Sequence, residues 1–82
     1  MAKLNVKAFG LACGITWGAG MFLIGIIDIF TVWADAWGAL MATVYIGYSP
    51  TVIGSIIGGI WGFFDAGIGG AILAWLYNKF AK

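Results

Sequence analysis

The sequence contains no histidine, a single cysteine, a single proline and few charged residues. Without histidine it lacks the commonest general base and the commonest ligand for zinc, copper and haem iron. Cys13 alone cannot form an intrachain disulfide or a metal cluster, so we expect it to be a small packing residue in a helix. Because there is also no phosphate-binding loop and no nucleophile–base pair, we predict that the protein is not an enzyme and binds no metal or other cofactor.

Charge is scarce and apolar side chains dominate. Of the 82 residues, 63% are hydrophobic and 9% are charged. A soluble domain has about 25% charged residues and could not bury this much apolar surface at this size. The composition therefore predicts one integral membrane domain, residues 1–82, whose first partner is the lipid bilayer. The net charge of +1 and the lack of a basic run argue against nucleic acid as a partner.

Two long apolar segments predict membrane-spanning helices, at about residues 8–30 and about residues 50–78. The uncharged run at 8–27 would extend about 30 Å as a helix, which is the thickness of the hydrocarbon core. It is too long for the apolar region of a signal peptide, so we expect a retained span. Ser49 followed by Pro50 predicts the start of the second span, with Ser49 as the N-cap.

In the connection, about residues 31–49, the uncharged part that follows Asp35 is too short to span the membrane. Its large apolar side chains gather on one side of a helical wheel: Trp33, Trp37, Leu40, Met41, Val44 and Tyr45. This pattern predicts a short interfacial helix, with Trp33, Trp37, Tyr45 and Tyr48 at headgroup level. An extension of the first helix that bends back is the alternative. Gly47 is the predicted end of the helical part.

The lysines predict the topology. All four lie near the chain ends, whereas the connection has no Lys or Arg and has acids at its start, Asp28 and Asp35. The positive-inside rule places both termini in the cytoplasm and the connection outside, in a multi-pass protein of the cytoplasmic (inner) membrane. The simplest interpretation of the two acids is that they are solvated at the interface. The alternative is a negatively charged outer mouth that attracts cations.

Small residues recur at intervals of four in both predicted spans, in the pattern of a glycine zipper. Those that we assign to helix packing and oligomerisation are Gly10, Gly14, Gly18, Gly54, Gly58, Gly62, Gly69 and Gly70. Such stripes let helix backbones approach closely in lipid. They offer more close-packing surface than one hairpin can use. We therefore predict an all-α helical hairpin that assembles as a homo-oligomer, with another membrane protein as the other candidate partner.

Asp65 is the one acid of the second span, roughly 20 Å from each of its ends. An ionised Asp at that depth costs about 2.5–3.5 kcal/mol on insertion scales, and the chain has no cation there. The donors that we expect nearby are the indole N–H groups of Trp61 and Trp17 and the hydroxyl of Thr16. Asp65 is therefore either a proton or ion site, such as one of a ring of acids around a pore, or a neutral acid that joins helices by hydrogen bonds.

Motifs along nearly the whole chain are shared with a known group of small membrane proteins. They are LNVKAFGLA at residues 4–12, WG at 17–18, GYSP at 47–50, GSIIGGIWGFFDAGIGG at 54–70 and AWLYN at 74–78. Through them the chain resembles the two-span proteins labelled bacteriophage holins. Holins accumulate in the inner membrane and assemble into lesions that release a cell-wall hydrolase. The resemblance implies a homo-oligomeric protein that forms a pore or channel.

A glycine-rich first helix and a mid-membrane acid in the second also resemble the proteolipid ring subunit of rotary ATP synthases. The ring subunit has a polar, basic loop in the cytoplasm, whereas the connection here is apolar and acidic. We keep only the physical analogy of a membrane-embedded carboxylate, Asp65. The alternative to a holin-like pore is a non-catalytic membrane scaffold or a small accessory subunit of a larger membrane complex.

Overall fold

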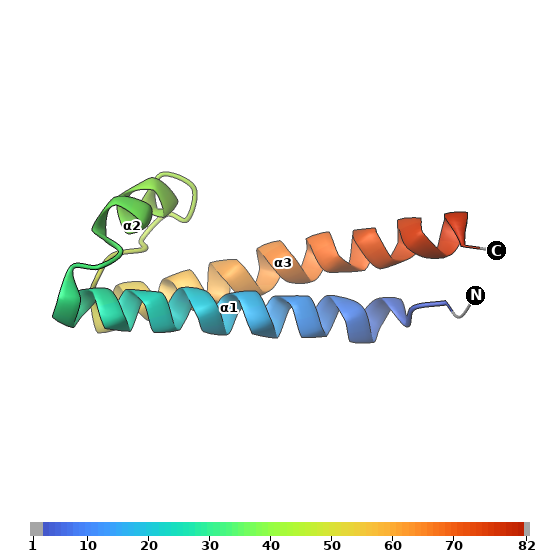
Figure 1. The fold of residues 1–82 in the computed structure, drawn as a ribbon, viewed down its shortest axis with the longest axis horizontal. Helices are drawn as coiled ribbons and strands as arrows, with labels where there is room; N and C mark the ends of the chain where they lie inside the picture. The colour runs from blue at the N-terminus through green and yellow to red at the C-terminus, as the bar shows by residue number, and fades with distance from the viewer. Residues whose placement is uncertain (1–2, 82) are drawn as a thin grey trace.

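A computed structural model describes residues 3–81, which contain three helices. They are α1 (Val6–Thr31), α2 (Asp35–Ala42) and α3 (Val52–Phe80). The two long helices run antiparallel, side by side, along a molecule 48 Å long (Figure 1). The short α2 lies at one end, and the described ends of the chain lie at the other. The prediction of an all-helical hairpin with two long apolar helices is confirmed.

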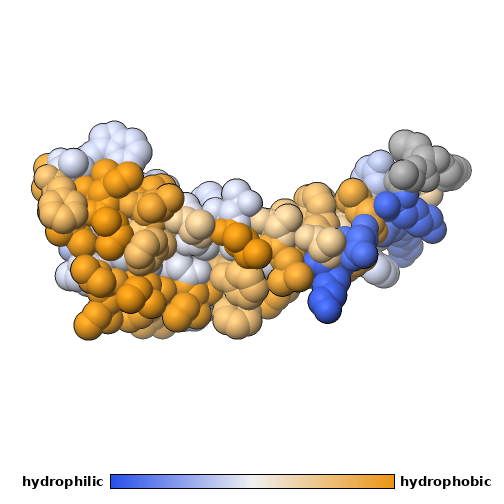
Figure 2. Space-filling view, turned by 90° about the horizontal axis from the view of Figure 1, so that it is seen from below, coloured by the Kyte–Doolittle hydropathy of each residue, from blue (hydrophilic) through white to orange (hydrophobic). Residues whose placement is uncertain are grey.

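Both long helices exceed the length that a bilayer requires. At 1.5 Å per residue, the 26 residues of α1 extend about 39 Å and the 29 residues of α3 about 43 Å, against a hydrocarbon core of about 30 Å. Both are also apolar enough to cross a membrane. Apolar residues cover most of the face shown in Figure 2, and hydrophilic residues gather at the end where α1 begins and α3 ends.

Side-chain caps set where the two long helices begin. Asn5 caps α1 by accepting the backbone N–H of Ala8 at 3.0 Å. Thr51 caps α3 by accepting the N–H of Gly54 at 2.9 Å, so the predicted N-cap at Ser49 is wrong. The β-branched Thr51 has the extended backbone that a cap requires, and the proline therefore precedes the helix instead of lying in its first turn.

The glycines of α1 bring the two long helices into backbone contact. A Cβ atom at Gly10, Gly14 or Gly18 would lie 2.7–2.9 Å from a backbone carbonyl oxygen of α3. No real Cβ tolerates that distance, so only glycine allows this approach. We call this contact of Gly10, Gly14 and Gly18 with α3 the glycine seam. In this structure the first stripe therefore packs α1 against α3.

The glycines of α3 are also covered by the chain's own segments. Their contacts are Gly70 with Cys13, Gly62 with Met21, Gly58 with Tyr48, and Gly54 with Ser49. Cys13 is thus a small packing residue, as predicted. At Gly20 and Gly69, by contrast, nothing lies within 4 Å of where a Cβ would be. Of the eight glycines assigned to packing and oligomerisation, only Gly69 is therefore left uncovered by the described residues, and assembly as a homo-oligomer stays a prediction.

The connection folds back onto the long helices. Its helix, α2, has eight residues, and turns carry the chain from there to α3. The backbone turns at Val32 and Gly47, which both have positive φ (50° and 94°). Trp33 is 71% exposed, but Tyr45 and Tyr48 are only 2% and 5% exposed and form a small core with Met21. The two tyrosines therefore pack against the hairpin, whereas Trp33 does not, and their level relative to the lipid headgroups stays a prediction.

Candidate functional site

Asp65 lies on the outer surface of α3, not in the glycine seam. It follows the first residue of α3 by 13 residues, or about 20 Å of helix. The side chain is exposed, and its Oδ2 accepts a hydrogen bond of 2.6 Å from the hydroxyl of Tyr45. Within residues 3–81 no hydrogen bond to its second oxygen occurs. One half of the carboxyl is thus bound within the chain, and the other half is free to bind something else.

Tyr45 links the acid to α1. The indole N–H of Trp17 donates to the Tyr45 hydroxyl oxygen at 2.9 Å. Because an indole nitrogen only donates, the hydroxyl oxygen must be the acceptor in that bond, and its own proton points to Asp65. The hydrogen-bond chain therefore runs in one direction, from Trp17 through Tyr45 to the accepting carboxyl of Asp65, and bonds in such a chain strengthen one another.

Trp61 holds the backbone of the connection beside this chain. Its ring stacks on Tyr45 with 6.0 Å between centroids and 7° between planes. Its indole N–H donates to the carbonyl oxygen of Ile46 at 2.9 Å. Two indole donors and one aromatic stack thus fix Tyr45 against α1 and α3.

The four residues predicted to form the polar site divide into two groups. Trp17, Trp61 and Asp65 do come together, but neither indole donates to the carboxyl, because the Tyr45 phenol lies between them. The side chain of Thr16 is exposed and makes no hydrogen bond within residues 3–81. The predicted donors were therefore wrong in detail, and the residue that binds Asp65 directly was missed.

The signal for Tyr45 was present in the sequence. An acid in an apolar helix needs a donor, and the connection carries two tyrosine hydroxyls in an unusually apolar segment. The helical wheel instead assigned Tyr45 to an interfacial face. A second missed contact is the pair of hydrogen bonds, both 2.7 Å, between the Asn78 amide and the backbone of Leu4. It closes the other end of the hairpin.

A groove of about 410 Å³ opens beside Asp65, and we call it the Asp65 groove. Apart from Asp65 and the Tyr45 hydroxyl its lining is apolar or aromatic, and it includes Gly69, one helical turn beyond the acid. Because the space at Gly69 is open, another backbone can approach α3 there. The site thus combines a half-bound carboxyl with an unoccupied place for a helix.

The two acids at the other end of the hairpin form a pair. Asp28 is 5% exposed, and its Oδ1 accepts the backbone N–H of Ala34 at 2.8 Å. Asp35 is exposed, and a hydrogen bond to Asp28 raises its pKa above the ordinary value, with desolvation and the charge of Asp28 acting in the same direction. The expectation of a solvated acid is therefore wrong for Asp28, which the first turn of the connection covers.

Comparison with known proteins gives no relative. No family model matches the chain, and no curated protein or solved structure is similar to it. The holin-like character of the sequence motifs therefore remains a hypothesis. Function has to be inferred from the residues and their geometry.

Proposed function

We propose that the chain is a holin-like protein of the inner membrane whose copies assemble around a pore or channel. In this proposal α1 and α3 cross the bilayer, the lysine-bearing ends lie in the cytoplasm and α2 lies outside. The two long apolar helices support the crossing. The lysines at both ends and the acids around the connection support the orientation.

The exposed, half-bound Asp65 is the observation that carries the proposal. In a crossing helix it lies near the middle of the bilayer, where a carboxylate facing lipid costs about 2.5–3.5 kcal/mol on insertion scales. One donor from Tyr45 leaves the other oxygen without a partner in the described part of the chain. Water or an ion in a path between copies would satisfy it. Several copies that turn this face inward would surround the path with acids.

Gly69 gives the copies a place to meet. The glycine seam is filled within each hairpin, whereas the space at Gly69 is open and adjoins the acid. Close approach of helix backbones at small residues is a common basis of association in lipid. The contact between copies in this proposal is therefore the Asp65 groove, whereas Gly58 and Gly62 are covered within the hairpin.

Ion flux through liposomes tests the pore. We expect the protein to conduct cations and Asp65→Asn to lose this flux and its dependence on pH. Asparagine keeps a carbonyl oxygen for the Tyr45 hydroxyl, so the hairpin should remain folded. Asp35→Asn is the matched control, because it removes an acid far from the groove. Equal flux through Asp65→Asn and the unaltered protein would remove the acid from any path.

A scaffold or accessory subunit is the second candidate, and the bond from Tyr45 favours it. That bond already gives Asp65 a structural task, since it ties the connection to α3. In this alternative the reconstituted protein conducts no better than protein-free liposomes, yet Tyr45→Phe, which deletes this bond, still loosens the connection. Flux and stability measured on the same preparation therefore separate the two functions.

A further inference from the structure

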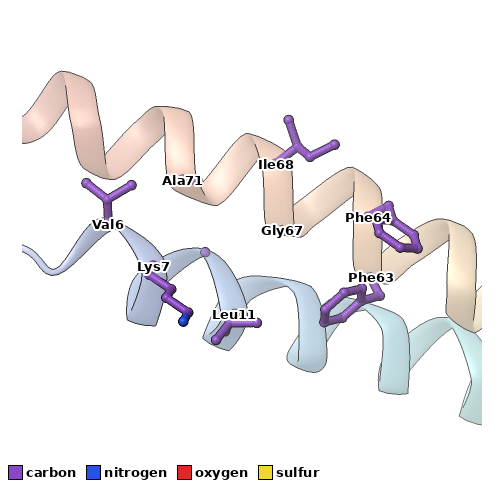
Figure 3. Close-up of a pocket in the computed structure, with 9 residues that line it drawn as sticks. Val6, Lys7, Leu11, Phe63, Phe64, Gly67, Ile68 and Ala71 are labelled. Carbon is purple, nitrogen blue, oxygen red and sulfur yellow. The ribbon is translucent and has the colours of Figure 1, made fainter.

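A second groove opens between α1 and α3 at the lysine-bearing end, beside Lys7 (Figure 3). Its volume is about 260 Å³, and we call it the Lys7 groove. Small residues, Gly10 and Gly67, make the hollow, while Leu11 and Phe63 are among the large side chains around it. Apart from the amine of Lys7, its lining side chains are apolar.

The Lys7 groove continues along the same two helices. A further apolar hollow of about 420 Å³ reaches Phe22, and both hollows are lined by Phe63 and Phe64. From Lys7 to Phe22 is 15 residues, or about 22 Å of helix. One leaflet of the hydrocarbon core is about 15 Å thick, half of about 30 Å. The hollows together are therefore long enough for an acyl chain that extends through one leaflet.

The cation at the mouth of this groove is unpaired among the residues that the structure describes. Lys7 makes no ion pair within residues 3–81. Lys79, on the neighbouring helix, differs because its amine lies over the ring of Trp75 at 5.3 Å from the centroid. Figure 3 shows the Lys7 side chain extending along α1 toward Leu11. A free ammonium at the end of an apolar channel calls for an anionic group that carries a hydrocarbon chain.

We propose that the Lys7 groove binds an anionic phospholipid, with the phosphate at Lys7 and one acyl chain along the seam between α1 and α3. Basic pockets between membrane helices on the cytoplasmic side are recognised sites for anionic headgroups. The inference rests on the membrane insertion and orientation proposed above, but it does not depend on a pore.

Lipid competition on the intact protein tests the headgroup. The protein is taken up in detergent with equal amounts of phosphatidylglycerol and phosphatidylcholine that carry identical chains, and bound lipids are counted by native mass spectrometry. We expect about a fivefold preference for phosphatidylglycerol, as one lysine near an anionic surface provides. Lys7→Gln should abolish this preference and Lys79→Gln should retain it. No preference in the unaltered protein, or equal effects of the two variants, would overturn the proposal.

Filling the groove tests the acyl chain. A Cβ at Gly67 would meet its nearest atom at an ordinary 3.5 Å, so Gly67→Leu should fold and extend into the hollow. We expect it to retain less of both lipids, whereas Gly20→Leu, on open surface, should bind them as the unaltered protein does. Undiminished binding by Gly67→Leu would contradict the chain's placement. Should Gly67→Leu not fold, Lys7→Gln still tests whether the groove binds an anionic lipid, because losing a cation from the first turn of α1 does not weaken that helix.

Failure of the pore and failure of the lipid site give different results. Liposomes that show no flux, with the preference and its loss in Lys7→Gln intact, would remove the pore and keep the site. Liposomes that show flux, together with a protein that has no lipid preference, would keep the pore and remove the lipid site.

Discussion

The two faces of α3 are held by different kinds of contact. Toward α1, at the glycine seam, backbone meets backbone and no side-chain hydrogen bond is involved. Toward the connection, the phenol of Tyr45 and two indoles make directed hydrogen bonds and an aromatic stack. The glycine seam requires that no side chain lie between the two backbones, whereas the Tyr45 contact requires polar side chains. Adding a side chain should therefore break the seam, and removing the phenol hydroxyl should break the Tyr45 contact.

Crowding the seam should have the largest effect. In Gly14→Leu the new Cβ would lie 2.7 Å from the backbone oxygen of Phe63, which cannot move without the helix. We expect the helices to separate, at a cost of about 3 kcal/mol in the free energy of unfolding. Unfolding in mixed detergent micelles, followed by circular dichroism, measures this. Gly20→Leu makes the same change where space is open, and an equal loss there would mean that close approach is not the cause.

Deleting the phenol hydroxyl should have the next largest effect. Tyr45→Phe keeps the ring stacked on Trp61 but leaves the indole of Trp17 and the carboxyl of Asp65 without their shared partner. An unsatisfied polar group costs about 1–3 kcal/mol, and we expect a loss in that range. The same unfolding assay applies, with the exposed Trp33→Phe as the control. Should Tyr45→Phe be as stable as the unaltered chain, the Trp17–Tyr45–Asp65 chain has no structural role.

The pair of acids, Asp28 and Asp35, should have the smallest effect on stability. The sign of this effect follows from the raised pKa of Asp35. A carboxyl that binds its proton more tightly when folded stabilises the fold fully below the ordinary pKa of 3.8, and this contribution is lost as the pH rises through the raised pKa. Docking of α2 should therefore weaken from acid toward neutral pH. Asp35→Asn should remove this dependence, as hydrogen exchange of the Gly38 amide would report. A pH profile equal in both proteins would exclude the pair as its source.

The long helices could be predicted from the sequence because length and apolar character alone determine them. The glycine seam was predictable from spacing alone, since intervals of four put Gly10, Gly14 and Gly18 on one face of the helix. The partner of Asp65 was not. It depends on backbone turns at Val32 and Gly47 that bring residues 20 and 28 positions apart into contact.

The start of α3 shows the same limit on a smaller scale. Ser49, Pro50 and Thr51 all suit a helix N-terminus, and the choice among them depends on how the connection packs across the first turn. Ser49 lies against Gly54 there, and its hydroxyl bonds that of Thr51 at 2.9 Å. Local propensity thus predicted the helix to within two residues, and tertiary contact chose the cap.

The central claim is that the Asp65 groove adjoins water when the protein is assembled in a membrane. Labelling of a single cysteine tests it most directly. In a Cys13→Ala background, Ile72→Cys lines the groove and leaves both the acid and Gly69 in place, whereas Ile60→Cys is an equally exposed position outside it. We predict that a water-soluble thiol reagent modifies Ile72→Cys in liposomes and leaves Ile60→Cys unreacted. Two equally unreactive cysteines would mean that the groove is dry and that Asp65 serves only to hold the hairpin together.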